Sequence, residues 1–131
     1  MEQRTLLVVD GNAGDRANTI SQIRRDLNFN YQVTEAGTLA EGLAAVDRAR
    51  PDCVVLDQKL PDGSGLDFLL AVGDMHGHLP FPVIILTSAG DLESAVALMK
   101  AGALDYLVKS NAATEAVRIA VNNAIYKVHV E

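Results

Sequence analysis

Four residues with side chains suited to handling a phosphoryl group each stand at the end of a short apolar segment. They are Asp10, Asp57, Thr87 and Lys109. An aspartate carboxylate can attack phosphorus, and a divalent cation held by carboxylates can offset the negative charge. A hydroxyl group and an ammonium group can hold phosphoryl oxygens. Each residue alone is weak support, but the four together predict a phosphoryl-transfer site if the fold brings them to one edge.

Asp57 lies in the most informative stretch of the chain. It follows the apolar run 53–56, and turn residues follow it at 61–63. The run predicts a buried strand bounded by a turn. Open α/β sheets bind their ligands at the carboxyl ends of strands, where this prediction places Asp57. Taken alone, the carboxylate could be a nucleophile toward phosphorus, a metal ligand or a helix-capping group.

Apolar runs that predict strands alternate along the chain with patterns that predict helices. Strands are expected at 6–9, 31–36, 53–57, 82–87 and 104–109, with a helix after each. Strict alternation with largely apolar strands indicates a parallel sheet covered on both faces. The predicted fold class is α/β: a doubly wound five-stranded parallel sheet of flavodoxin-like order 2-1-3-4-5, with five helices.

The first predicted helix has a capping residue, a charge in its first turn and an apolar stripe. Asn12 is expected to cap it, and Asp15 places negative charge in its first turn. Its apolar stripe is predicted from Ala17, Ile20, Ile23 and Leu27.

Composition excludes several classes of protein. A length of 131 residues suits one domain over 1–131, and a net charge of −6 argues against this domain binding nucleic acid by itself. Cys53 is the single cysteine, so no internal disulfide can form, and a buried inert thiol is expected. No apolar stretch reaches the roughly 18–20 residues of a membrane helix, and the N-terminus is no signal peptide. We predict a cytoplasmic domain without membrane contact.

The chain resembles the receiver domain of two-component response regulators over essentially its whole length. The resemblance rests on Val8-Val9-Asp10, Val55-Leu56-Asp57, Leu60-Pro61-Asp62-Gly63, Leu86-Thr87-Ser88 and the segment 100–109. It implies that Asp57 accepts a phosphoryl group from a histidine kinase or a histidine phosphotransfer protein. Thr87 resembles the hydroxyl residue that moves toward the acyl phosphate, and Lys109 the lysine that pairs with it. Tyr106 resembles the aromatic residue whose rotation reports activation.

The same resemblance implies a signalling module and not an enzyme. Phosphorylation is expected to change the face formed by the fourth helix, the fifth strand and the fifth helix, and a homodimer could form there. Magnesium is the expected cofactor, held weakly by Asp10, Asp57 and the backbone carbonyl of Lys59. The ammonium group of Lys59 could offset charge in the site or remain in water.

Two positions depart from the family pattern. Gly11 stands where the family has a second acidic residue that ligates the metal directly. Asp15 could replace that ligand, but the preferred interpretation is a negative charge in the first turn of the helix. Ser110 stands where the family has a proline after a cis bond, so a trans Lys109–Ser110 bond is predicted.

The departure at Gly11 keeps an alternative open. The chain could be a pseudo-receiver, an interaction module with impaired metal binding and phosphorylation. A phosphatase with an aspartate nucleophile is disfavoured, because that class would place a second acid where Lys59 stands.

Overall fold

A computed structural model describes residues 2–109 and 115–130 of the chain. In these residues a five-stranded parallel sheet is flanked by five helices, and a two-stranded hairpin lies beside it. The elements are β1 (Glu2–Val9), α1 (Ala13–Ile23), β2 (Phe29–Ala36), α2 (Leu39–Arg48), β3 (Cys53–Leu56), β4 (Lys59–Leu60), β5 (Gly63–Ser64), α3 (Gly65–His76), β6 (Val83–Thr87), α4 (Leu92–Lys100), β7 (Asp105–Val108) and α5 (Ala116–Val130). The sheet order β2-β1-β3-β6-β7 confirms the predicted order 2-1-3-4-5.

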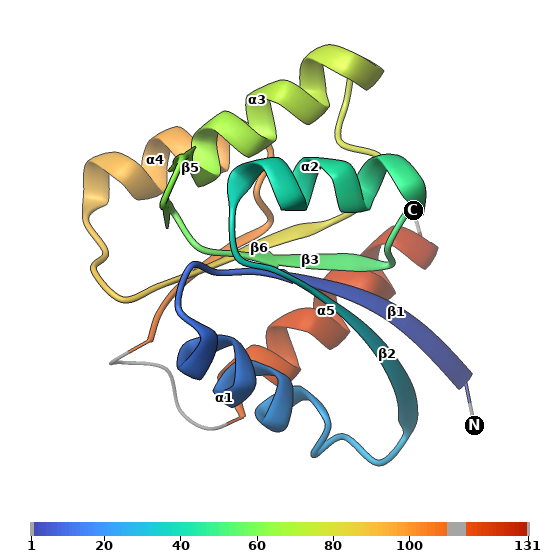
Figure 1. The fold of residues 1–131 in the computed structure, drawn as a ribbon. Coiled ribbons are helices and arrows are strands. Elements are labelled where there is room, and N and C mark those ends of the chain that lie inside the picture. The colour runs from blue at the N-terminus through green and yellow to red at the C-terminus, as the bar shows by residue number, and fades with distance from the viewer. Residues whose placement is uncertain (1, 110–114, 131) are drawn as a thin grey trace.

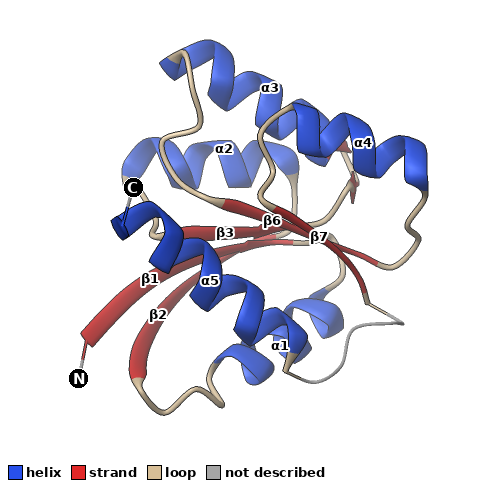
Figure 2. Cartoon of the chain, turned by 180° about the vertical axis from the view of Figure 1, so that it is seen from behind, coloured by secondary structure: helices blue, strands red, loops and turns tan. Residues whose placement is uncertain are grey.

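The sheet separates two layers of helices. α2, α3 and α4 cover one face, and α1 and α5 cover the other (Figure 1). Figure 2 shows the same layers from behind. Because strand side chains alternate between faces, Leu6 and Val8 pack toward α1 and α5, while Leu7 and Val9 pack toward the other helices. This burial on both faces explains why the central strands β3 and β6 are continuous apolar runs.

The helix α1 is shorter than its apolar pattern predicts. Asn12 caps it as expected, and its side chain accepts a hydrogen bond from the backbone N–H of Asp15 at 2.9 Å. The helix ends at Ile23, so Leu27 lies beyond it and is 81% exposed. The prediction that Leu27 belongs to the apolar stripe of this helix is therefore wrong. Ile20 and Ile23 carry the packing of this helix on the sheet.

The β4–β5 hairpin brings the chain after Asp57 back toward the start of α3. Gly65 begins that helix, and its backbone N–H donates to the carbonyl of Gln58 at 3.0 Å. A Cβ atom on Gly65 would lie 2.8 Å from the carbonyl oxygen of Asp57, closer than real Cβ contacts. Glycine thus permits α3 to pack directly on the backbone of the candidate site.

Three further predictions concern Cys53, membrane-spanning helices and the Lys109–Ser110 bond. Cys53 is fully buried, and burial raises the pKa of its thiol to about 12, as expected for an inert cysteine. Among residues 2–109 and 115–130, no helix is long and apolar enough to cross a membrane. The Lys109–Ser110 bond lies outside the described residues.

Candidate functional site

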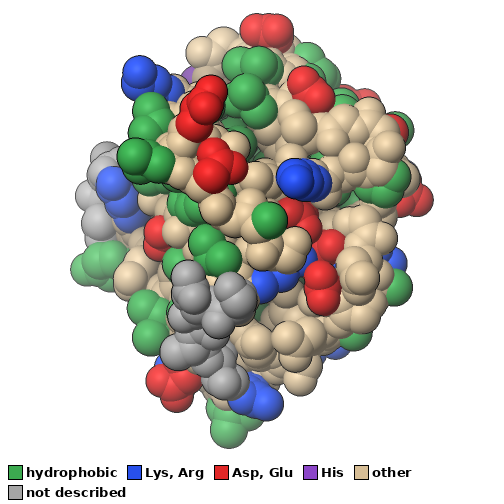
Figure 3. Space-filling model, turned by 90° about the vertical axis from the view of Figure 1, so that its left-hand side faces the viewer, with side chains coloured by type: hydrophobic (Ala, Val, Ile, Leu, Met, Phe, Trp, Pro, Cys, Tyr) green, Lys and Arg blue, Asp and Glu red, His purple; other side chains and the backbone are tan. Residues whose placement is uncertain are grey.

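Strand register places the four predicted residues together at the carboxyl edge of the sheet. Val9 pairs with Leu56 across β1 and β3, so the next residues, Asp10 and Asp57, lie side by side. Thr87 pairs with Val108 across β6 and β7, and Lys109 follows directly. Figure 3 views the molecule from this edge and shows acidic and basic side chains meeting near the middle of the face.

The ammonium group of Lys109 joins three carboxylates at this edge. Its Nζ donates to Oδ2 of Asp10 at 2.6 Å, of Asp15 at 3.0 Å and of Asp57 at 3.2 Å. The Lys109 side chain is 18% exposed, and those of Asp10 and Asp57 are 6% and 10% exposed. In such partly desolvated surroundings, charge-assisted hydrogen bonds are stronger than at the open surface.

The charge of Lys109 is stabilised by this arrangement. Burial alone would lower the pKa of the lysine, but the hydrogen bonds to Asp10 and Asp15, together with the negative charges of Asp57 and Asp10, raise it above its ordinary value. Lys109 therefore remains a cation at neutral pH. Three carboxylates around one ammonium group leave an excess of negative charge, which suits a further cation.

Asp15 makes a side-chain contact that the sequence does not predict. Its backbone does lie in the first turn of α1, as interpreted. Its side chain also reaches across to Lys109, so the residue belongs to the site as well as to the helix terminus. The side chain is 43% exposed, which makes it the most solvent-accessible of the three carboxylates.

Backbone contacts fix the positions of the two central aspartates. The backbone N–H of Asp10 donates to Ala36 at 3.0 Å, and that of Asp57 donates to Val9 at 2.9 Å. Oδ1 of Asp10 accepts a hydrogen bond from the backbone N–H of Asn12 at 2.9 Å. These contacts continue the strand ladders by one residue, so both carboxylates project from rigid elements.

The remaining predicted residues lie around this centre. Thr87 ends β6 and is 1% exposed, and its carbonyl accepts from the backbone N–H of Lys109 at 2.7 Å. Lys59 is exposed and begins the β4–β5 hairpin. Its backbone N–H lies 3.4 Å from Oδ1 of Asp57. Tyr106 is half-buried in β7, three residues before Lys109.

A magnesium ion fits the chemistry of these residues. The site offers carboxylate and carbonyl oxygens, the hard donors that magnesium prefers, and an excess of negative charge. Across the described part of the chain, no three His, Cys, Asp or Glu side chains are grouped so that they alone could hold a metal. The remaining ligands would be backbone oxygen and water, which magnesium accepts readily.

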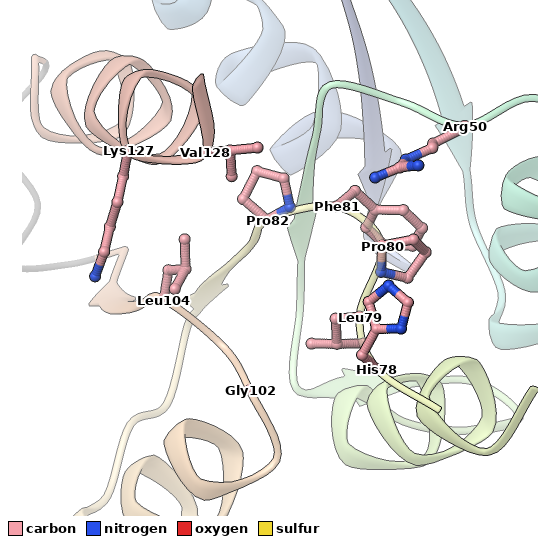
Figure 4. A pocket seen from close by; sticks show the side chains of 10 residues that line it. All are labelled: Arg50, His78, Leu79, Pro80, Phe81, Pro82, Gly102, Leu104, Lys127 and Val128. Carbon is pink, nitrogen blue, oxygen red and sulfur yellow. The ribbon is translucent and has the colours of Figure 1, made fainter. Parts of the chain in front are cut away.

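A cavity lies at the end of the sheet opposite the carboxyl edge. It has a volume of about 230 Å³ and is lined by residues that include Phe81, Pro82 and Leu104. Its cationic side chains, Arg50 and Lys127, extend on opposite sides of the space and do not converge (Figure 4). The carboxyl edge is therefore the better candidate for chemistry.

Comparisons with known proteins agree with this fold and identify the family of the chain. The family model described as "Response regulator receiver domain" matches residues 6–121. The regulatory protein LuxO of Vibrio cholerae is 37% identical over 99 residues, which cover 76% of this chain and 21% of that protein. The transcriptional regulatory protein KdpE of Mycobacterium tuberculosis is 43% identical over 93 residues, covering 67% of this chain and 40% of that protein.

A solved structure extends the likeness to nearly the whole chain. The response regulator receiver domain protein of Clostridium thermocellum has a TM-score of 0.83 and 32% identity, with 97% of this chain and 98% of that chain covered. The curated relatives are longer: this chain spans less than half the length of each of the two named above.

Proposed function

Because this chain belongs to the family of response regulator receiver domains, we propose that it accepts a phosphoryl group on Asp57 and relays that event as a conformational change. The observation that carries the proposal is the pairing of Asp57 with Lys109 beside Asp10, at the carboxyl edge of the sheet. The proposed donor is a histidine kinase or a histidine phosphotransfer protein of a two-component system. The proposed unit is a single receiver domain over residues 1–131.

The proposed reaction is a transfer from histidine to aspartate. A carboxylate oxygen of Asp57 attacks phosphorus, the phosphorus–nitrogen bond of the donor breaks, and the donor imidazole takes up a proton. The product is an acyl phosphate on Asp57. Lys109 is close enough to pair with the new phosphoryl oxygens, since its Nζ already lies 3.2 Å from Oδ2 of Asp57.

Magnesium would be held by Asp10, Asp57 and the carbonyl of Lys59, with Asp15 nearby. When bound, it would offset the negative charge that accumulates as the phosphoryl group approaches two carboxylates. Both carboxylate oxygens of Asp10 already accept one hydrogen bond, from Asn12 and from Lys109, but each has a second lone pair with which it could hold the ion.

The proposal is tested by measuring the intact mass of the chain after incubation with acetyl phosphate and magnesium. We expect the mass of one phosphoryl group to be added, and to be removed by base or hydroxylamine as for an acyl phosphate. No added mass across a range of magnesium concentrations would favour the alternative, a pseudo-receiver that acts as an interaction module. Gly11 is the observation that keeps this alternative in view.

The metal site gives a prediction about Gly11. Replacing Gly11 with aspartate should tighten magnesium binding about fivefold, because one added close charge contact is worth about 1 kcal/mol in a partly buried site. The new Cβ would lie 3.0 Å from Cδ of Pro61, so the proline ring must shift slightly. The measurement is a calorimetric titration with magnesium.

Asp15→Asn is the matched comparison in the same titration. It removes a carboxylate that contacts Lys109 without touching the β4–β5 hairpin, and it should weaken binding. Equal affinity in all three proteins would mean that neither position faces the ion.

The switch gives a prediction about Thr87. We propose that Thr87 moves toward the phosphoryl oxygens and that Tyr106 responds, which alters the face formed by α4, β7 and α5. Thr87→Ala should therefore still be phosphorylated, but its amide chemical shifts on this face should no longer respond. Thr87→Ser retains the hydroxyl and should keep the response. A full response in Thr87→Ala would remove the residue from the mechanism.

The same face is proposed as the surface for a partner, including a second copy of the chain. Three large apolar side chains of α4 are exposed: Leu92 is 81% exposed, and Val96 and Met99 are each 44% exposed. Only Leu98 of this helix is buried. Sedimentation with and without phosphodonor measures whether phosphorylation promotes a homodimer.

A further inference from the structure

The side chain of Gln58, directly after the proposed phosphoacceptor, connects three elements of the site. Gln58 is 8% exposed, and its Oε1 accepts a hydrogen bond from the hydroxyl of Tyr106 at 2.6 Å. Its Nε2 donates to the carbonyl of Ala89 at 3.1 Å. Ala89 lies in the loop 88–91 between β6 and α4. One buried amide thus joins the end of β3, the aromatic ring on β7 and the loop before α4.

The hydrogen bonds fix the orientation of this amide. The hydroxyl of Tyr106 also accepts from the backbone N–H of Asp91 at 3.3 Å, so its proton is free to be donated to Gln58. A reversed amide would place its oxygen against the carbonyl of Ala89, where no hydrogen is available. Only this orientation of the amide gives hydrogen bonds to both its oxygen and its nitrogen.

The loop 88–91 packs directly on the ring that Gln58 holds. A Cβ atom on Gly90 would lie 2.5 Å from Cγ2 of Val108 and 3.2 Å from the hydroxyl oxygen of Tyr106. Asp91, at the end of the loop, caps α4 by accepting from the backbone N–H of Ser94 at 2.7 Å. A displacement of the Tyr106 ring would therefore alter the contacts of Asp91, the residue that caps α4.

From these contacts we propose that Gln58 is a positioning residue that holds Tyr106 beneath the loop 88–91 in the unphosphorylated protein. Phosphorylation of the neighbouring Asp57 releases this contact, so the signal reaches Tyr106 through the residue after the phosphoacceptor as well as through Thr87. The release rests on the function proposed above. The positioning does not, because it concerns the protein before any phosphoryl group arrives.

The first test needs no phosphodonor. The chain has three tyrosines, so labelling with ¹³C at the ring carbon that bears the hydroxyl gives three signals, and Tyr106→Phe assigns one of them. Gln58→Met keeps the length of the side chain but removes both hydrogen bonds, and it should shift the signal of Tyr106. The signals of Tyr31 and Tyr126 serve as internal controls. An unmoved Tyr106 signal would overturn the proposal.

A double-mutant cycle tests whether the two residues act as a pair. Gln58→Met and Tyr106→Phe should each raise the unfolding equilibrium constant about three- to tenfold, because each removes the same buried hydrogen bond. The double variant should fall short of the product of the two effects, because the shared bond can be lost only once, whereas the bond of Gln58 to Ala89 and that of Tyr106 to Asp91 are lost separately. If the two effects multiply, the contact is not the reason for either. Glu93→Gln, an exposed exchange in the first turn of α4, is the control and should leave the Tyr106 signal in place.

The release is tested with acetyl phosphate and magnesium. In the wild-type chain the Tyr106 signal should move on phosphorylation, and Gln58→Met alone should move it part of the way in the same direction. Movement in the opposite direction would overturn the release. A chain that shows the coupling but gains no phosphoryl mass would retain Gln58 as a positioning residue and would refute only the function proposed for Asp57.

Discussion

Replacing Asp57 with asparagine is expected to abolish phosphorylation of the chain by acetyl phosphate and magnesium. Asparagine has the same shape as aspartate but carries a neutral amide, which cannot form the acyl phosphate by direct attack. The fold should persist, because the backbone N–H of Asp57 still donates to Val9 and Gly65 still packs on its carbonyl. Intact mass and peptide mapping measure the loss.

Asp74→Asn is the matched control for this experiment. Asp74 is exposed on α3, away from the carboxyl edge, and its variant should be phosphorylated as fast as the wild-type chain. A phosphoryl group that persists on Asp57→Asn would place the acceptor elsewhere. Asp10 would then be the first residue to test, since it is the neighbouring buried carboxylate on the same ammonium group.

The sheet could be predicted because its signal is local. The strands β3 and β6 and the second half of β1 are buried on both faces and read as short apolar runs, and the right-handed alternation with helices leaves few possible orders. Once the order is known, the carboxyl ends of neighbouring strands must share an edge. This is why Asp10, Asp57, Thr87 and Lys109 could be placed together without any knowledge of side-chain contacts.

Contacts between distant side chains could not be predicted in the same way. Asp62 lies in a turn, as the sequence predicts, but its carboxylate also accepts from the backbone N–H groups of Leu39 and Ala40 at 2.7 and 3.1 Å. These bonds lower the pKa of Asp62 and tie the β4–β5 hairpin to the start of α2. Nothing in the spacing of the sequence indicates a partner 23 residues away.

Asp15 and Gln58 illustrate the same limit inside the site. The position of Asp15 in the first turn of α1 fully accounts for its acidic character, so its reach to Lys109 had no separate signal. Gln58 lies between the predicted strand and the turn, where polar residues are usual, so nothing in the sequence indicates that its side chain is buried. A buried amide needs hydrogen-bond partners, and its bond to Tyr106 is seen only in the structure.

Lys109→Met is expected to destabilise the chain and to make its stability depend strongly on magnesium. The substitution removes the one ammonium group that the three carboxylates share, and leaves Asp10 and Asp57 partly buried beside each other without it. Removing one partner of a buried ion pair costs about 3–5 kcal/mol, and the 43% exposure of Asp15 favours the lower end. Urea unfolding in the absence of magnesium measures the loss.

Added magnesium should then stabilise Lys109→Met more than it stabilises the wild-type chain. In the variant the ion no longer competes with an ammonium group for Asp10 and Asp57, and it relieves repulsion between them. Lys127→Met, an exposed change on α5, is the control and should respond to magnesium as the wild-type chain does. If the variant were as stable as the wild type and gained nothing extra from magnesium, the carboxylates would not depend on a shared cation. The electrostatic basis of the proposed metal site would then be lost, whichever residue accepts the phosphoryl group.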